Sequence, residues 1–227
     1  MRLLLLLCGV ASPLLYALAD ALGGLRWAGY SFRDQTISEL GAIGAPSRPL
    51  FAALLVVVYL LFTAFGVGIW KSAQGRRRLR LAGGLLIGLG VLALTVGQFA
   101  AMQLRGTEQG ISGALHLIEG AAAMILLLAA MGFAGAALGR GFALYTIATV
   151  AVMLSFGGWS AMEIPLVEAG LPTPWVGVKE RIYWYSYQLW YIVLSIKLLR
   201  ETDGARETSR ASTMAARVSA RHLPRCP

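Results

Sequence analysis

The chain has 227 residues, of which 57% are hydrophobic and only 14% are charged, and its mean hydropathy is +0.67. This composition excludes a water-soluble domain of the same length and predicts a membrane protein. The formal net charge of +9 fits basic residues that flank membrane spans and attract anionic lipid. We therefore expect membrane lipids as partners and no nucleic acid.

Six long apolar segments predict six transmembrane helices. Each crossing needs roughly 20 mostly apolar residues in helical form, because lipid offers backbone amides no hydrogen-bonding partner. The predicted fold is an all-α membrane protein, a six-helix up-and-down bundle within residues 1–200, followed by a disordered, basic, cytoplasmic tail over 201–227. The predicted spans are about 2–22, 50–70, 81–103, 115–138, 142–162 and 183–200.

The first span also resembles a secretory signal peptide. Arg2, a Leu-rich core and the Ala17-Leu18-Ala19 triplet match a charged start and a small-residue cleavage site. Apolar character continues to about Leu25, and Pro13 is tolerated inside a packed span, so we favour a helix that is retained.

The connection after the first span contains a dense polar motif, RDQTISELGAIG, at residues 33–44. Within it, Thr36 and Glu39 have the spacing of a capping box, which predicts a short helix and gives Glu39 a local structural role. The alternative is a loop that folds back over the bundle and brings its charges, including Arg33 and Asp34, above the fourth span.

Basic residues predict the orientation, because Lys and Arg accumulate on the cytoplasmic side of a membrane. The densest run lies between Lys71 and Arg80. Placing it inside puts both termini in the cytoplasm, with 14 of the 20 basic residues inside and six outside. The predicted location is the cytoplasmic membrane, with the polar loop at residues 33–44 on its outer face.

The fourth span carries His116 and Glu119, three residues apart on one helix, so their side chains can meet or face one ligand. A charge at mid-bilayer costs roughly 2.5–3.5 kcal/mol on insertion scales, so Glu119 should face protein or water. A carboxylate beside an imidazole suits a general base, and a structural ion pair is the alternative interpretation.

The last span begins with adjacent charges at Glu180 and Arg181. Glu180 suits the positive end of a helix, whereas Arg181 does not. We therefore expect Arg181 to have an anionic partner or to reach the interface, the candidate partners being a lipid phosphate, Glu119, Asp34 or Glu39. The aromatic run Tyr183 to Tyr191 is interpreted as interfacial anchoring, with a cation-binding cage as the alternative.

Metal and disulfide chemistry has little support in the sequence. Cys8 and Cys226 are far apart and form no Cys-x-x-Cys motif, and His222 in the tail is the only histidine besides His116. No Gly-rich phosphate loop or Gly-x-Ser-x-Gly elbow is present. We expect no metal and no cofactor, and no feature supports an oligomer.

Three sequence features together resemble a known family. They are the Asp-x-x-Ile-Ser-Glu-Leu-Gly core at residues 34–41, a histidine early in the fourth helix, and Gly-x-x-Glu-Arg at residues 177–181. Over about residues 5–200 the chain resembles the prokaryotic six-helix membrane proteins grouped as domain of unknown function 998. The resemblance implies six helices and no particular activity, and it links Asp34, Ser38, Glu39, His116 and Arg181.

We expect a multi-pass integral membrane protein whose outer polar pocket binds a lipid headgroup or a small polar ligand. One alternative is an intramembrane lipid-directed hydrolase or transferase in which His116 is the base, Glu119 orients it and Ser38 is the nucleophile. A small transporter is another. No clear nucleophile is evident, so we favour a non-catalytic role. The candidate ligand-binding residues are Arg33, Asp34, Glu39, His116, Glu119, Glu180 and Arg181.

Overall fold

The computed structural model describes the backbone of residues 1–221 and the side chains of residues 1–202. Over this range the regular secondary structure is helical, apart from an isolated bridge between Ile43 and Gln103. The helices are α1 (Arg2–Arg26), α2 (Ile37–Leu40), α3 (Arg48–Ser72), α4 (Arg77–Phe99), α5 (Gly110–Ala137), α6 (Arg140–Ala161), α7 (Ile164–Glu168) and α8 (Val176–Arg221).

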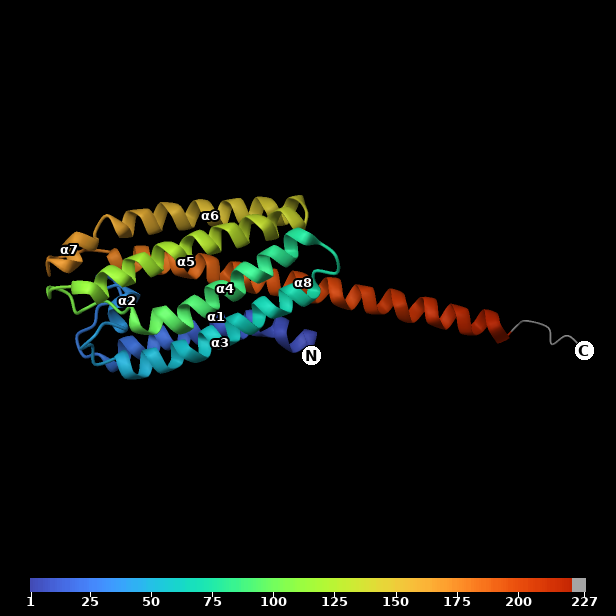
Figure 1. The fold of residues 1–227 in the computed structure, drawn as a ribbon, viewed down its shortest axis with the longest axis horizontal. Helices are drawn as coiled ribbons and strands as arrows, with labels where there is room; N and C mark the ends of the chain where they lie inside the picture. Colours follow the sequence, from blue (N-terminus) through green and yellow to red (C-terminus); the bar gives the residue numbers. More distant parts are fainter. Residues whose placement is uncertain (222–227) are drawn as a thin grey trace, which may run out of the picture.

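The six long helices lie side by side (Figure 1), and their contacts form a ring. In order around the ring they are α1, α3, α4, α5, α6 and α8, and α8 closes the ring by packing against α1. Tight turns at residues 73–76 and 138–139 connect neighbours, and Gly75 and Gly139 adopt positive φ angles of 85° and 90° there. Both turns are at one end of the bundle, which we call the turn end.

Five helical segments are long and apolar enough to cross a membrane by length and composition: α1, α3, α4, α5 and the segment from Arg140 to Glu168. This confirms a membrane protein with an all-helical fold. α8 is less apolar, because Tyr, Ser and Gln residues occur along the part that lies in the ring. Its role as a sixth span therefore stays a prediction.

The helix bounds differ from the predicted spans where polar side chains determine the ends. α4 ends at Phe99, not near residue 103, and α5 begins at Gly110, not near residue 115. The Ala100 carbonyl at the end of α4 is a hydrogen-bond acceptor for the imidazole of His116, and hydropathy carries no information about such a contact.

α8 is longer than predicted, because it continues as a helix to Arg221. We expected disorder from residue 201, and over 201–221 the backbone is helical instead. Ala, Arg and Glu recur in this segment and favour helix. The rest of the predicted tail, residues 222–227, lies outside the described residues.

Small residues allow α3 and α4 to approach closely. A Cβ atom added at Gly83 would lie 2.7 Å from the backbone nitrogen of Trp70, and one at Gly66 would lie 2.9 Å from that of Ile87. Each contact is shorter than a real Cβ allows, so glycine is required at both positions.

Candidate ligand-binding site

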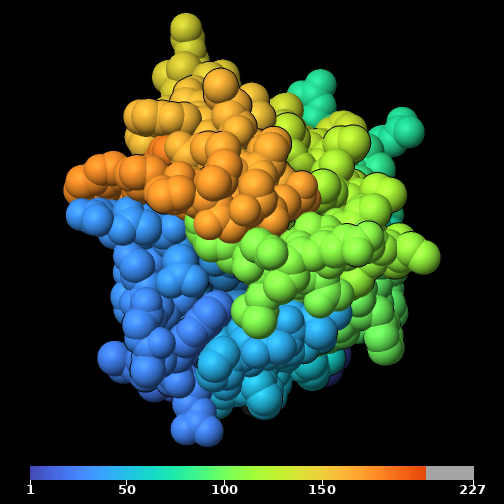
Figure 2. All heavy atoms as spheres, turned by 90° about the vertical axis from the view of Figure 1, so that its left-hand side faces the viewer, coloured from blue at the N-terminus to red at the C-terminus, as the bar shows by residue number. Residues whose placement is uncertain are grey.

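Opposite the turn end, three long connections gather, at residues 27–47, 100–109 and 162–175 (Figure 1). We call this the loop end. Figure 2 looks onto it and shows the blue, green and orange segments in contact, covering the end of the ring. The first connection contains Arg33, Asp34 and Glu39, and the remaining candidate ligand-binding residues lie on α5 and α8.

Glu39 lies at the centre of the loop end and is 0% exposed. Its carboxylate accepts a hydrogen bond from the backbone N–H of Thr36 at 2.7 Å, and the Thr36 hydroxyl accepts one from the backbone N–H of Glu39 at 3.2 Å. The predicted capping box is therefore present and starts α2.

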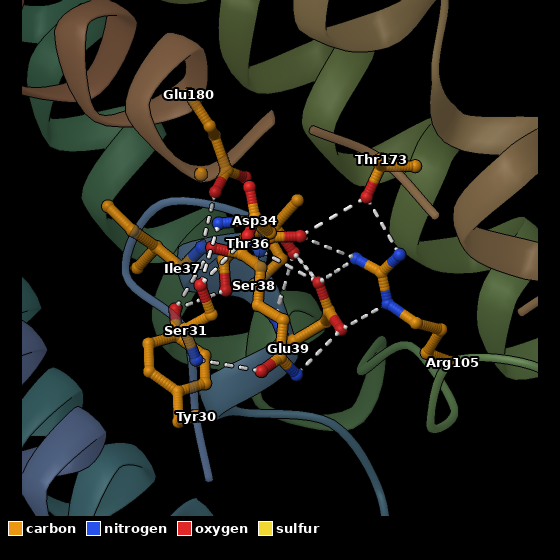
Figure 3. Close-up of polar contacts among 12 residues, drawn as sticks. Tyr30, Ser31, Asp34, Thr36, Ile37, Ser38, Glu39, Arg105, Thr173 and Glu180 are labelled. Carbon is orange, nitrogen blue, oxygen red and sulfur yellow. Dashed lines mark hydrogen bonds and ion pairs between the residues drawn. The ribbon is translucent and has the colours of Figure 1, made fainter. Parts of the chain in front are cut away.

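Arg105 neutralises Glu39 and joins the three connections (Figure 3). Its Nε and Nη2 donate to the two carboxylate oxygens of Glu39, each at 2.9 Å, in a bidentate pair. Nη1 donates to the Thr173 hydroxyl at 2.7 Å, and Nη2 also donates to the Asp34 carbonyl at 3.1 Å. Arg105 was not among the predicted site residues, and its only signal in the sequence is that it is a lone basic residue in a connection at the same end as the acidic loop.

Glu180 reaches from α8 to the start of α2. Its carboxylate accepts hydrogen bonds from the backbone N–H of Ile37 and, at 3.2 Å, from the hydroxyl of Ser38. It thereby pairs the Ile37 amide, one of those that a helix N-terminus leaves free. Glu180 precedes the predicted span at 183–200, and burial raises its pKa to about 7.

Arg181 pairs with Asp20 at the end of α1. Its Nη2 and Nε donate to the two Asp20 oxygens at 2.7 and 3.0 Å, and the Tyr185 hydroxyl donates to the same carboxylate at 2.7 Å. An anionic partner was expected, but its predicted identity was wrong. The ring brings α1 beside α8, so Asp20 takes the place of the expected partners Glu119, Asp34 and Glu39.

Arg33 and Asp34 form a more exposed pair at 2.9 Å. Asp34 also accepts a hydrogen bond from the backbone N–H of Trp175 at 3.0 Å, and the Arg33 guanidinium lies 5.3 Å from the centre of the Trp175 ring. The guanidinium and this amide lower the pKa of Asp34 to about 2. The pair thus fixes the loop to the start of α8.

His116 and Glu119 do not bond to each other. The His116 Nδ1 lies 2.9 Å from the Ala100 carbonyl oxygen, and since a carbonyl only accepts, the ring nitrogen donates. Among the residues with described side chains, Glu119 has no hydrogen-bond or ion-pair partner. It lies beside Gly97, where an added Cβ would be 3.4 Å from its carboxylate oxygen.

The ring encloses a cavity of about 530 Å³, lined by residues from all six long helices. We call it the central cavity. α5 contributes His116 and Glu119 to its wall, α8 contributes a row of aromatic side chains, and Glu180 with Ser38 lies at its loop end. The buried aromatics Tyr187 and Tyr191 belong to this wall, so interfacial anchoring is wrong for them.

The structure divides the predicted ligand-binding residues into two groups. His116, Glu119 and Glu180 line the central cavity, together with Ser38. The others hold the loop end together and are absent from the cavity wall: Arg33, Asp34, Glu39 and Arg181. Among the side chains of residues 1–202, no three His, Cys, Asp or Glu residues are close enough to hold a metal ion.

The helical fold and its membrane-capable helices define this chain as a membrane protein. The sequence model of the family described as "Protein of unknown function (DUF998)" matches residues 10–197. The chain therefore belongs to that family, as the loop motif indicated. Searches of curated proteins and of solved structures each found no match.

Proposed function

We propose that this chain is a multi-pass protein of the cytoplasmic membrane that binds a lipid-like amphiphile or its polar headgroup in the central cavity. In this proposal α8 is the sixth span, the loop end is outside, and both the basic turn end and the chain termini are cytoplasmic. Basic residues at the turn end, including Arg76 and Arg140, support this orientation.

The observation that carries the proposal is the central cavity itself. Its volume of about 530 Å³ is in the range of small-molecule sites, which combine a mostly apolar wall with a few convergent polar groups. Leu89, Leu127 and Phe62 supply apolar wall, and Glu119 supplies a polar group that has no partner among the described side chains.

The loop end supports binding by closing the cavity. Arg105 attaches the first connection to the other two through its bidentate pair with Glu39 and its hydrogen bond to Thr173. Arg181 joins α8 to α1 through its bidentate pair with Asp20 and also donates to carbonyls of the first connection. Bidentate Arg–carboxylate pairs hold loops in fixed geometry. We regard these residues as structural supports of the site and expect no contact between them and the ligand.

The hydrolase or transferase alternative is less well supported. Ser38 donates its hydroxyl to Glu180, and His116 donates to Ala100. Because a serine nucleophile needs its base within hydrogen-bond reach, these partners do not favour His116 as the base that activates Ser38.

A cavity-filling variant tests the proposal. Gly120 lines the central cavity, and a Cβ added there meets no atom within 4 Å, so Gly120→Phe should fill the cavity without displacing the backbone. Gly132 lies on the same helix away from the cavity and is equally unhindered, so Gly132→Phe is the matched control.

Both variants would be placed in nanodiscs with photo-crosslinkable tetradecanol, tetradecylamine and tetradecanoate. We expect at least one probe to cross-link to cavity residues of the wild type and of Gly132→Phe, and to lose roughly tenfold in yield in Gly120→Phe. Equal yields in all three proteins for every probe would reject a binding function for this cavity.

A further inference from the structure

We infer that the central cavity is selective for an amphiphile with a positively charged amine head and a hydrocarbon tail. The inference rests on the proposed function and names the chemistry of its ligand. Three independent features of the cavity wall support it: the sign of its charges, an unsatisfied buried amide, and an aromatic surface.

Acidic side chains outnumber basic ones on the cavity wall. Glu119, Glu168 and Glu180 line it, whereas Arg48 and the imidazole of His116, which donates to the Ala100 carbonyl, are the basic groups that do among the described side chains. Arg48 already donates to the Gly41 carbonyl. A cleft lined by one sign of charge and enclosed by low-dielectric walls concentrates the opposite sign, so the wall favours a cation.

Of the acids on the long helices, Glu119 is the one that a ligand can reach, and Glu168 lies apart from it on α7 at the loop end. Glu180 is occupied by the N-terminus of α2, but the Glu119 carboxylate has no partner among the described side chains. Glu119 lies between two and three turns into α5. An unpaired carboxylate at that depth is costly, and a cationic group beside it would remove the cost.

Gln188 supplies an independent sign of a ligand. This side chain is 6% exposed and lines the cavity, and its Oε1 is buried with no hydrogen-bond partner among the described residues. Buried polar atoms are nearly always paired. Because an ammonium group carries only donors, it suits both the amide oxygen of Gln188 and the carboxylate of Glu119.

The aromatic wall suits a cation as well. Tyr183, Trp184 and Tyr187 follow one face of α8 and line the cavity, and neighbouring ring centres are 5.3–5.7 Å apart. The faces of such rings attract ammonium groups. This agrees with the alternative interpretation of the aromatic run as a cation-binding cage.

The apolar part of the cavity wall and the exposed residues at its edge favour an amphiphile as the ligand over a small free cation. Leu127, Met124 and Leu89 provide apolar surface for a tail. Gly120 and Ala121 of α5 and Ala161 of α6 line the cavity and are exposed, so the cavity is open beside α5 and α6, and in this proposal a tail enters there from lipid.

The experiment compares three probes that share one tail. The full chain in nanodiscs of zwitterionic lipid would be titrated at neutral pH with photo-crosslinkable tetradecylamine, tetradecanol and tetradecanoate. Glu119→Gln removes the charge and keeps the shape, and Glu108→Gln removes a carboxylate from an exposed loop outside the cavity. Comparing variants with the same probe cancels its partition into the bilayer.

We expect the wild type and Glu108→Gln to be half-saturated by the amine at roughly tenfold lower concentration than by the other probes. Glu119→Gln should lose that preference and keep its affinity for the alcohol. If the wild type shows no preference, or if Glu119→Gln keeps it, the inference is wrong while binding itself stands. If Gly120→Phe does not reduce the cross-linking yield of any probe, the proposed function is wrong as well.

A second variant covers the case in which Glu119→Gln does not fold. Gln188→Met removes the amide and keeps the length of the side chain, and it leaves Glu119 unchanged. We expect Gln188→Met to weaken binding of the amine probe more than binding of the alcohol probe. Equal effects on the two probes would argue against an amine that pairs with Gln188.

Discussion

Three connections that are distant in the sequence meet at the guanidinium of Arg105. Its partners Glu39 and Thr173 lie 66 and 68 positions away along the chain. Glu39 is buried, so its charge depends on Arg105 for compensation. A few charged side chains therefore hold the loop end together, and we expect their removal to destabilise the protein to different extents.

Arg105→Ala should be strongly destabilising, because it leaves the buried Glu39 carboxylate unpaired. Breaking such a pair costs about 3–5 kcal/mol. Thermal unfolding in detergent should show a large fall in Tm, and adding Glu39→Gln to Arg105→Ala should restore part of it. Arg33→Ala breaks an exposed pair and serves as the control, with little change expected. A small effect of Arg105→Ala would contradict the dependence of the buried Glu39 side chain on Arg105.

Glu180 should make the free energy of unfolding depend on pH. Its pKa is raised from 4.5 to about 7, so between these values the folded chain holds a proton that the unfolded chain releases. The free energy of unfolding therefore decreases as pH rises through this window and levels off above about 7, by on the order of 3 kcal/mol. Arg181 opposes the shift and Glu39 adds to it.

Glu180→Gln should remove this dependence. The Tm of Glu180→Gln minus the Tm of wild type should increase from about pH 5 to about pH 8. The reason is that the variant has no carboxylate that must be buried in its charged form. A Tm difference that is constant across this range would contradict a raised pKa at Glu180.

The positions of the helices were easier to predict from the sequence than the contacts between them. Apolar length marked the positions of the long helices, and the spacing of Thr36 and Glu39 predicted α2 with its cap. Packing partners depend on which helices adjoin, which hydropathy does not encode. The Asp20 partner of Arg181 lies 161 positions away and becomes adjacent only because α8 closes the ring against α1.

The contact between α3 and α4 gives a prediction at the scale of elements. Gly83→Ala should destabilise the protein by about 1–3 kcal/mol, because the added Cβ would lie 2.7 Å from the Trp70 nitrogen. Gly88 lies on the same helix with no atom within 4 Å of an added Cβ. Gly88→Ala should therefore be neutral or stabilising by up to about 1 kcal/mol. Equal Tm values for both variants would contradict the close approach at Gly83.

At the scale of the whole molecule, the ring has two unlike ends. The turn end is basic and closed by short turns, whereas the loop end is covered by three interlocked connections (Figures 1 and 2). Sequence patterns separate these ends because charge and loop length are local properties. They do not predict the cavity between them, since it depends on six helices leaving the centre unfilled.

Labelling of single cysteines tests the orientation and the sixth span together. After Cys8 and Cys226 are replaced, Glu108→Cys and Leu171→Cys at the loop end should react with a membrane-impermeant maleimide in intact cells. Gln74→Cys and Glu201→Cys at the turn end should react only after permeabilisation, because basic segments stay in the cytoplasm. All four positions are exposed, so a lack of reaction reports sidedness. Labelling of Leu171→Cys and Glu201→Cys from one side would mean that α8 does not cross, and reversed labelling of Glu108→Cys and Gln74→Cys would invert the topology.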